Sequence, residues 1–393
     1  MKILVLLPRF PYPLDKGDKL RAYHQMEELA KRHEVYLFAL SHSTVPHDHY
    51  NRLKTVCTAV NYFRLHWWEA AWGVFTAFLK GKPLQLGYWT SRRARRAYAA
   101  WERQVQPDVV YCQMVRTIPT LNAKHLTLNT KHILDFQDAL SLNTRRRMES
   151  SKGFWRMILK YEYRALQRIE QQALQLFDAT TVIAPTDQSV LAPSVVIVPN
   201  GVDTDFFNRQ QLPATNYPLP AHSICFCGNM SYAPNIDAAR YLVDEVMPIV
   251  WEHCPEATVL LAGADPKPAV RALASDKVTV SGRLPDIRTA YASSQLFVAP
   301  MRIGSGLQNK LLEAMAMQLP CITTTLANTP LGTTSGEHLL VGDTPEMLAN
   351  HIIQLLCSEE QRAHLADAGH RFVQQHFSWP AAVAPLEDII LNS

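Results

Sequence analysis

The sequence predicts an α/β protein of two domains, each a doubly wound parallel sheet with helices on both faces, and three observations predict it. The chain has 393 residues, which is too long for one core and suits two domains of about 200 residues each. Short apolar runs rich in β-branched residues alternate with longer helical patterns. A polar, proline-containing stretch, 209–222, separates two such series. We therefore expect two domains that face a cleft.

The N-terminal series begins with a buried strand, because its apolar opening run is too short for a signal peptide or a membrane span. The strands that we expect in this half are 2–8, 34–40, 107–113, 132–138, 179–185 and 194–200. The clearest helices are the amphipathic stretches 18–32 and 145–176.

The C-terminal series repeats the same alternation after the polar stretch. Its expected strands are 224–229, 257–263, 277–282, 295–300 and 320–325, and its expected helices are 237–254, 286–293 and 309–317. In such sheets ligands bind at the carboxyl ends of the strands, so functional residues are expected in the loops that follow strands.

Composition places the chain among ordinary globular proteins, with 47% hydrophobic and 19% charged residues. Its seven cysteines form no Cys-x-x-Cys pair, which favours a reducing compartment and a cytoplasmic location. Residues 1–205 carry 28 Lys/Arg against 18 Asp/Glu, a balance of +10, and the remaining residues carry 11 against 17, a balance of −6. The basic half therefore indicates an anionic partner, and since no nucleic-acid-binding motif accompanies it, nucleic acid is not expected.

Two neighbouring stretches of the basic half have two interpretations. The stretch 66–82 is rich in aromatic residues, and the stretch 91–103 carries four arginines before apolar residues at helical spacing. In the first interpretation the pair lies peripherally on the anionic inner face of the plasma membrane, with Trp67, Trp68, Trp72 and Phe75 dipping in. In the second, the aromatic residues belong to the core and the arginines form a solvated face. Both stay open here.

The most informative segment is 299–324, where a strand leads through a glycine-containing loop into a helix. A diphosphate is expected at the free backbone amides of Gly304, Ser305, Gly306 and Leu307. Lys310 adds a positive charge one turn on, and Glu313, on the same helix face, offers a carboxylate to ribose hydroxyls. The alternative is a capped helix whose lysine and glutamate form a surface pair.

This segment resembles the donor site of the retaining family-four (group 1) glycosyltransferases, in which the helix carries Glu-Ala-Met-Ala, here 313–316, followed by Pro320. The stretch 198–207 resembles the boundary motif of that family, and 377–379 resembles the start of its last helix. The resemblance implies GT-B architecture, with two Rossmann-like domains and a C-terminal helix that crosses back to the first. It implies an acceptor-binding domain at 1–205, a nucleotide-sugar-binding domain at 206–376 and the returning helix at 377–393.

In activity, the resemblance implies a metal-independent, retaining hexosyltransferase that needs no cofactor and uses a UDP- or GDP-linked sugar as co-substrate. The sequence itself contains no histidine cluster and no Asp-x-Asp motif that indicates a metal. More narrowly, the stretches 8–25 and 135–141 are similar to sugar transferases of bacterial exopolysaccharide clusters. That similarity implies a glycan or a polyprenyl-diphosphate-linked acceptor.

Acceptor contacts follow from the same resemblance, which carries over the loop after the first strand to Lys16, Gly17, Asp18 and Arg21. The alternative for this loop is a helix N-terminus capped by Asp18. Asp138 follows the strand segment 132–137, where the family often has a histidine that contacts the transferred sugar.

The catalytic candidates are Asp138, Lys310 and Glu313. We expect Asp138 to contact a sugar hydroxyl or the acceptor, or to act as a base. Its alternative is an N-cap or an ion pair with Arg145 or Arg146.

The sequence departs from the family at two places. Ser305 stands where the family has the first of two glutamates, so it supplies no carboxylate to the donor sugar. The loop 228–235 lacks the usual arginine and lysine, so phosphate binding falls on backbone amides, including those at Gly228 and Asn229, on Lys310, and on Arg302 or Arg283. Two alternatives stay open: a nucleotide-sugar 2-epimerase, and a non-catalytic nucleotide-sugar-binding subunit.

Overall fold

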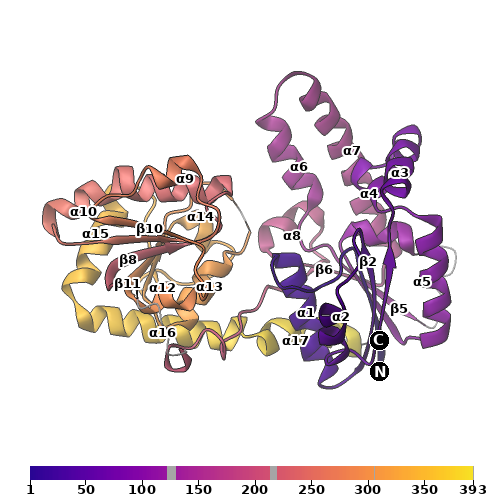
Figure 1. Ribbon diagram of the computed structural model, residues 1–393. Coiled ribbons are helices and arrows are strands. Elements are labelled where there is room, and N and C mark those ends of the chain that lie inside the picture. The colour runs from indigo at the N-terminus through magenta and orange to yellow at the C-terminus, as the bar shows by residue number, and fades with distance from the viewer. Residues whose placement is uncertain (122–129, 213–218, 305, 393) are drawn as a thin grey trace. The chain divides into compact units, whose positions relative to one another are not determined.

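The structure is a computed structural model that describes residues 1–121, 130–212, 219–304 and 306–392 (Figure 1). The chain divides into two compact units. Unit 1 comprises Met1–Pro199 together with Val383–Ser393, and unit 2 comprises Asn200–Ala382. Each unit is built on its own parallel sheet, as the sequence predicts.

Within the described residues, the sheet of unit 1 has seven parallel strands in the order β3-β2-β1-β4-β5-β6-β7. They are β1 Lys2–Leu7, β2 Glu34–Ser41, β3 Ala59–Arg64, β4 Val109–Gln113, β5 Lys131–Asp135, β6 Ala179–Val182 and β7 Val196–Ile197. The six strands predicted for this half are confirmed, because each forms part of this sheet. The edge strand β3 was not predicted, since its sequence mixes apolar and polar residues without a clear period.

The helices of unit 1 pack around this sheet (Figure 1). They are α1 Gly17–Ala30, α2 His47–Lys54, α3 Trp67–Leu79, α4 Leu84–Tyr88, α5 Arg92–Val105, the 3₁₀ helix η1 Val115–Thr120, α6 Leu140–Glu149, α7 Gly153–Leu176 and α8 Pro185–Leu191. The single helix expected over 145–176 is in fact two helices. Gly153 adopts a φ of 59°, which glycine tolerates, and it separates α6 from α7.

In the described part of unit 2, six parallel strands lie in the order β10-β9-β8-β11-β12-β13. They are β8 His222–Cys227, β9 Val259–Ala262, β10 Val278–Gly282, β11 Ser294–Ala299, β12 Cys321–Thr323 and β13 Leu340–Val341. The five predicted strands are confirmed. The two-residue strand β13 is too short to leave a pattern in the sequence.

The helical elements of unit 2 are η3 Arg209–Gln211, α9 Ala233–Tyr241, the π-helical turn η4 Leu242–Val246, α10 Met247–His253, α11 Pro268–Arg271, α12 Arg288–Ala292, α13 Asn309–Ala316, α14 Thr325–Asn328, α15 Pro345–Cys357 and α16 Glu359–Phe377. The helix expected over 237–254 therefore contains a π turn. Pro248 lacks the N–H that would bond to the carbonyl of Asp244, so the regular hydrogen-bond ladder is interrupted there.

Each sheet has one point where the chain changes direction across it. In unit 1 this point lies between β1 and β4, and in unit 2 it lies between β8 and β11. Loops after such neighbouring strands diverge and leave room for a ligand at the carboxyl edge. The two sheets therefore place candidate sites at the loops after β1 and β4, and at those after β8 and β11.

The last helix, α17 Trp379–Leu391, is divided between the units. From Val383 onward it belongs to unit 1, where the Glu387 carboxylate pairs with Arg32 at 2.7 Å and Leu386 is fully buried. The predicted return of the C-terminal helix to the N-terminal domain is confirmed. Among the described helices, none is both long and apolar enough to cross a lipid bilayer.

Candidate functional site

The side chain of Lys310 joins the helix after β11 to the loop after β8. Its ammonium donates a hydrogen bond of 2.5 Å to Oδ1 of Asn235 and lies 4.8 Å from the centre of the Phe226 ring. Asn235 in turn donates from Nδ2 to the carbonyl of Asn229 at 2.9 Å. Burial lowers the pKa of Lys310 to about 8. The two loops at the switch point of unit 2 are thus joined by an asparagine and a lysine.

Two glycines allow the loops after β8 and β9 to approach each other closely. A Cβ on Gly263, which has a φ of +145°, would lie 1.7 Å from the carbonyl oxygen of Gly228. A Cβ on Gly228 would lie 2.7 Å from Nδ2 of Asn235. Gly263 therefore excludes a side chain, because the loops after β8 and β9 pack backbone against backbone there. A side chain at Gly228 would instead displace the Asn235 amide that bonds Lys310.

Glu313 lies one turn after Lys310, with a carboxylate that accepts a hydrogen bond of 2.7 Å from the hydroxyl of Tyr291 in α12. Burial raises the pKa of Glu313, while the Tyr291 hydroxyl and the Lys310 ammonium lower it. Tyr291 is itself 1% exposed, so it fixes one carboxylate oxygen. The other oxygen has no hydrogen bond among the described residues.

The glycine loop before α13 is partly described, and Ser305 lies outside the described residues. Gly304 has a φ of 108°, which a residue with a side chain rarely adopts. Gly306 accepts a hydrogen bond of 3.0 Å from the side chain of Gln308, and a Cβ on Gly306 would meet nothing within 4 Å. Leu307 packs on the core of unit 2, and no side chain caps the first turn of α13. Among the described residues, no side chain satisfies the amides at the start of α13, although the Leu311 amide bonds to the carbonyl of Gln308 at 2.9 Å. The remaining amides of this turn suit an anion site.

The two arginines predicted for the phosphates differ in their surroundings. Arg302 pairs with Asp237 at 2.9 Å and with Glu245 at 3.3 Å, and its guanidinium lies 4.1 Å from the ring centre of Tyr241. The hydrogen bonds to Asp237 raise its pKa. Arg283 follows β10, is exposed, and forms no ion pair within the part of the chain that the structure describes. Arg302 is already neutralised by two acids, whereas Arg283 is not.

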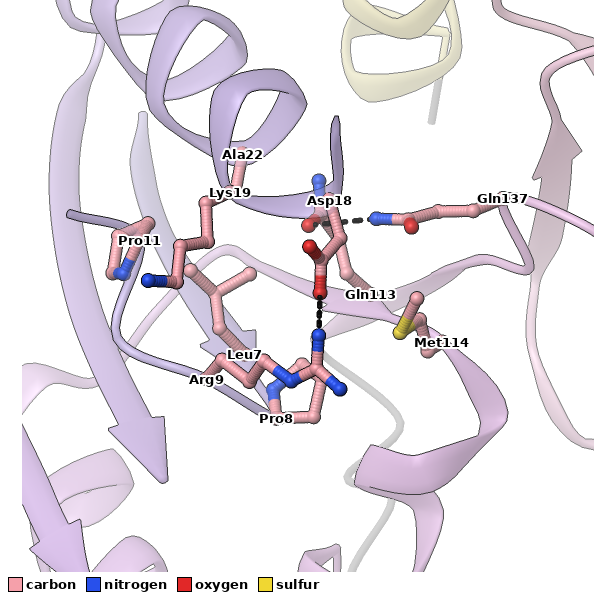
Figure 2. Close-up of a pocket in the computed structure, with 10 residues that line it drawn as sticks. All are labelled: Leu7, Pro8, Arg9, Pro11, Asp18, Lys19, Ala22, Gln113, Met114 and Gln137. Carbon is pink, nitrogen blue, oxygen red and sulfur yellow. Dashed lines mark hydrogen bonds and ion pairs between the residues drawn. The ribbon is translucent and has the colours of Figure 1, made fainter. Parts of the chain in front are cut away.

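In unit 1 a small pocket lies at the switch point between β1 and β4 (Figure 2). Arg9 in the loop after β1 pairs with Asp18 at 2.8 Å, and Figure 2 shows both side chains at this pocket. Asp18 therefore lies in the first turn of α1 without capping it, and the interpretation of Asp18 as an N-cap is wrong. Across the pocket, Gln137 donates to Gln113 at 3.1 Å.

A larger cavity of about 440 Å³ adjoins this loop, and its lining includes Lys16 and the neighbouring cations Arg9 and Lys19. Gly17 begins α1, and a Cβ there would meet nothing within 4 Å. Lys16 is exposed and forms no ion pair among the described residues. Arg9 pairs with Asp18, and Lys19 pairs with Asp15 at 2.8 Å. Among the described residues, the unpaired positive charge of this cavity therefore comes from Lys16.

Arg21 lies away from these openings. Its guanidinium is fully buried, and it donates to the Asp135 carboxylate at 2.8 Å and to the carbonyls of Val198 and Pro199 at 2.9 Å each. Asp135 also accepts a hydrogen bond of 3.0 Å from the hydroxyl of Tyr111. Arg21 therefore links α1, β5 and the segment after β7 inside the core. Because its side chain is fully buried there, we do not count Arg21 among the proposed acceptor contacts.

Asp138 follows β5 and sits beside the same buried network. Burial raises its pKa to about 6, helped by the neighbouring carboxylates of Asp187 and Asp135, while Arg21 and Arg116 lower it. Its carboxylate accepts no hydrogen bond among the described residues.

Asp138 neither caps a helix nor pairs with Arg145. Helix α6 begins after Ala139 without a side-chain cap, and Arg145 pairs with Glu149 at 3.0 Å. The Ala139 amide bonds instead to Asp187 at 3.0 Å. The interpretation of Asp138 as an N-cap is therefore wrong.

Backbone strain marks the same edge of the unit 1 sheet. Met114 after β4 and Gln137 after β5 adopt φ values of 63° and 62°, in the left-handed region that side chains disfavour, and both line the pocket of Figure 2. Strained residues gather at functional sites. Sequence reasoning missed both residues because φ leaves no composition signal, and it missed Asn235 and Tyr291 because their roles depend on tertiary contacts. Within the described residues no three side chains of His, Cys, Asp or Glu gather to hold a metal ion.

Two family descriptions match successive parts of the chain: "Glycosyltransferase Family 4" matches residues 20–206, and "Glycosyl transferases group 1" matches residues 221–358. An uncharacterized 44.6 kDa protein in the cps region of Klebsiella pneumoniae is 21% identical over 392 residues, which is 96% of each chain.

A second curated relative matches a shorter part of the chain. It is a GDP-mannose-dependent monoacylated α-(1-6)-phosphatidylinositol monomannoside mannosyltransferase of Corynebacterium glutamicum, 30% identical over 159 residues, which is 37% of this chain and 42% of that protein. The solved structure of Anabaena HepE in complex with UDP and glucose covers 100% of both chains with a TM-score of 0.62 and 14% identity, and shows the same GT-B fold. With both halves of the chain matched and the fold shared, the protein belongs to the family-four (group 1) GT-B glycosyltransferases, which use nucleotide sugars.

Proposed function

We propose that this glycosyltransferase transfers a hexose from a UDP- or GDP-sugar to a glycan or polyprenyl-diphosphate-linked acceptor, with retention of anomeric configuration and without a metal. The observation that carries the proposal is the placement of Lys310 and Glu313 on one face of α13, each held by a side chain from another element. Unit 2 binds the donor in this proposal, and unit 1 binds the acceptor.

In the proposed donor site, Glu313 accepts hydrogen bonds from the ribose hydroxyls while Tyr291 fixes the orientation of its carboxylate. The first amides of α13, together with Gly306 and Leu307, receive the diphosphate, and Lys310 adds the cation. Gly228 and Asn229 border the same site through Asn235. The exposed Arg283 supplies a further cation, a role that Arg302 takes only if it leaves Asp237 and Glu245.

The proposed chemistry depends on the leaving diphosphate. As the bond between the sugar and the phosphate lengthens, negative charge grows on the diphosphate, and Lys310 and the amides stabilise that charge more strongly than they stabilise the ground state. The departing phosphate oxygen takes the proton of the acceptor hydroxyl as the new bond forms on the same face. Asp138 contacts the sugar or the acceptor, and its raised pKa keeps it partly protonated near pH 6.

On the acceptor side, Lys16, Gly17 and Asp18 belong to the loop and helix start that border the cavities after β1. The ammonium of Lys16 in that region, unpaired among the described residues, suits an anionic acceptor such as a polyprenyl diphosphate. The relative from the cps region of Klebsiella pneumoniae supports a role in surface-polysaccharide synthesis in the cytoplasm.

The test is nucleotide release from a panel of UDP-, GDP- and ADP-sugars with EDTA present. We expect one donor to be turned over or, without acceptor, bound, and Glu313→Ala to abolish both. Glu252→Ala, which changes an exposed glutamate elsewhere in unit 2, is the matched control. Activity only with added metal, or unchanged donor binding by Glu313→Ala, contradicts the proposal. With an acceptor in hand, NMR of the product anomer tests retention.

A further inference from the structure

Helix α3 exposes its large nonpolar side chains and buries its small ones. Trp67 is 81% exposed, and Trp72 and Leu79 are each 66% exposed. Their spacing places them, with Trp68, Phe75 and Phe78, on one side of the helix. The opposite side, with Ala70, Gly73 and Ala77, is buried. A helix of a globular protein normally turns its large nonpolar residues inward, so α3 has the reverse arrangement.

A glycine contact fixes α3 in this orientation. A Cβ on Gly73 would lie 2.0 Å from the carbonyl oxygen of Gly87 in α4, so the two backbones are in direct contact. Glu69 on the same buried side accepts a hydrogen bond of 2.6 Å from the hydroxyl of Ser91. The aromatic side chains of α3 therefore face outward because its small residues are required against α4. The interpretation of these aromatic residues as core is wrong.

The beginning of α7 continues the exposed nonpolar surface. Phe154, Trp155 and Met157 are 66%, 67% and 62% exposed. Tyr161, one turn after Met157, donates from its hydroxyl to the carbonyl of Lys82 at 2.9 Å, and its ring centre lies 5.8 Å from that of Phe78. Helices α3 and α7 therefore meet here, as Figure 1 also shows. We call the exposed nonpolar side chains of Trp67–Leu79 and of 154–157 the α3–α7 surface.

Positive charge borders this surface. A cavity of about 360 Å³ is lined by Trp68 and Trp72 on α3 and by Lys80, Arg92, Arg93 and Arg95. The stretch 66–101 contains a single acidic residue, the buried Glu69. The side chains of Lys80, Arg92 and Arg93 form no ion pair within the described residues.

The start of α7 carries further cations, since Lys152, Arg156 and Lys160 are exposed there, again without an ion pair among the described residues. Both helices that contribute nonpolar side chains to the α3–α7 surface therefore have unneutralised cations nearby. The combination of exposed nonpolar side chains and nearby cations fits a partner that is nonpolar in its interior and negatively charged at its surface.

We propose that the α3–α7 surface enters the interface of an anionic lipid bilayer, and that the cavity lined by the arginines of α5 holds the phosphate of one of its lipids. Tryptophan favours the level of lipid headgroups, because its ring is nonpolar and its N–H is polar. Cations near such a surface attract anionic lipids. The inference rests on the proposed function in one respect: a lipid-linked acceptor would lie in the membrane that the α3–α7 surface binds.

The first test is co-sedimentation with phosphatidylcholine vesicles, with and without phosphatidylglycerol. We expect the wild type to bind the anionic vesicles, and Trp67→Ser/Trp72→Ser/Trp155→Ser to bind at least about tenfold more weakly. Val190→Ser/Met347→Ser, which changes exposed nonpolar residues on α8 and α15, is the control and should bind like the wild type. Equal binding by both variants overturns the proposal.

A second variant tests the cavity. Arg92→Gln/Arg93→Gln should lose the preference for phosphatidylglycerol while the exposed tryptophans remain. Brominated lipids should quench the tryptophan fluorescence of the wild type, because Trp67, Trp72 and Trp155 are exposed while Trp89 and Trp379 are buried. The absence of quenching overturns the proposal, because the tryptophans then do not enter the bilayer. Self-association in solution that buries the α3–α7 surface also overturns it, because the occupant is then a second copy of the protein.

These outcomes are separable from failure of the proposed function. Glu313→Ala, which lies in unit 2, should bind vesicles like the wild type even if it binds no donor. Conversely, the tryptophan variant should bind a soluble nucleotide sugar with unchanged affinity by calorimetry, which also reports that it is folded. A variant that loses donor binding as well is misfolded, and Phe154→Ser/Met157→Ser then replaces it on the second helix with the same expected loss.

Discussion

Lys310 donates a hydrogen bond to Asn235, a residue 75 positions earlier in the chain. This contact holds the ammonium in place before any ligand arrives, so the cation needs no rearrangement when a diphosphate binds. Preorganised charge of this kind is usually the largest single contribution to catalysis. In the proposed donor site, the contact brings a cation to the loop after β8, which has no arginine or lysine of its own.

Lys310→Ala should lower kcat for nucleotide release by about 100-fold, because the variant loses the cation that opposes the growing charge on the leaving diphosphate. The measurement is steady-state release of the nucleotide from the preferred donor. Lys267→Ala removes an exposed lysine from the same unit and should leave kcat unchanged. A Lys310→Ala enzyme within about threefold of the wild type would show that the amides alone stabilise the diphosphate.

Donor affinity should fall as the pH rises through about 8, because the pKa of Lys310 is lowered to about 8 and the neutral amine does not attract phosphate. Asn235→Asp places a carboxylate beside the ammonium and should move this loss of affinity to higher pH. Calorimetric titration of the nucleoside diphosphate from pH 6.5 to 9.5 measures both curves. Identical curves for the two proteins would show that Lys310 does not contribute its charge to diphosphate binding.

Asp138→Asn should increase the free energy of unfolding at pH 7.5 by on the order of 2 kcal/mol. In the folded protein the pKa of Asp138 is raised from 3.8 to about 6, so the folded state binds the proton more tightly than the unfolded state. Wild-type stability therefore contains a favourable contribution below pH 4 that is lost as the pH rises to about 6. The gain from Asp138→Asn should accordingly vanish in urea unfolding at pH 4, while its turnover falls at every pH.

Arg21→Met should lower the free energy of unfolding by about 3–5 kcal/mol, because it leaves the Asp135 carboxylate buried without its cation. Arg240→Met removes an arginine from an exposed pair with Asp244 and should cost less than about 1 kcal/mol. Urea unfolding of both variants gives the comparison. Similar small losses would mean that Tyr111 and Thr181 satisfy Asp135 without Arg21.

Gly263→Ala should destabilise unit 2 by more than about 3 kcal/mol, since the new Cβ would overlap the carbonyl of Gly228 and the loop after β8 would have to move. Gly332→Ala is the matched control, because Gly332 also has a positive φ, +70°, but a Cβ there meets nothing within 4 Å. Its cost should be about 1 kcal/mol of backbone strain. Thermal unfolding distinguishes the two, and donor binding should be lost only in Gly263→Ala.

Much of the fold was predictable because buried parallel strands are continuous apolar runs, as at β1 and β8. The position of Lys310 and Glu313 on one face of a helix was also predictable, since helical spacing alone puts them there. Asn235 and Tyr291 were not, because their contacts join elements far apart in the sequence.

Arg21 shows a different limit of sequence analysis. It follows a loop that borders a cavity, yet its place on α1 directs the guanidinium into the core, where Asp135 is its partner. Helix α3 shows another: its aromatic residues are as consistent with a core as with a surface until the Gly73 contact with Gly87 is known.

The position of α17 affects how the protein folds during its synthesis. Unit 1 contains the first 199 residues and the last 11, and Leu386 and Ile390 from that last segment are fully buried in it. On the ribosome, the N-terminal sheet therefore waits for its final helix until the whole of unit 2 has been synthesised. A fragment that stops at Pro199 would expose the surface that this helix covers, so an expressible N-terminal unit requires residues 383–393 to be joined to it by a linker.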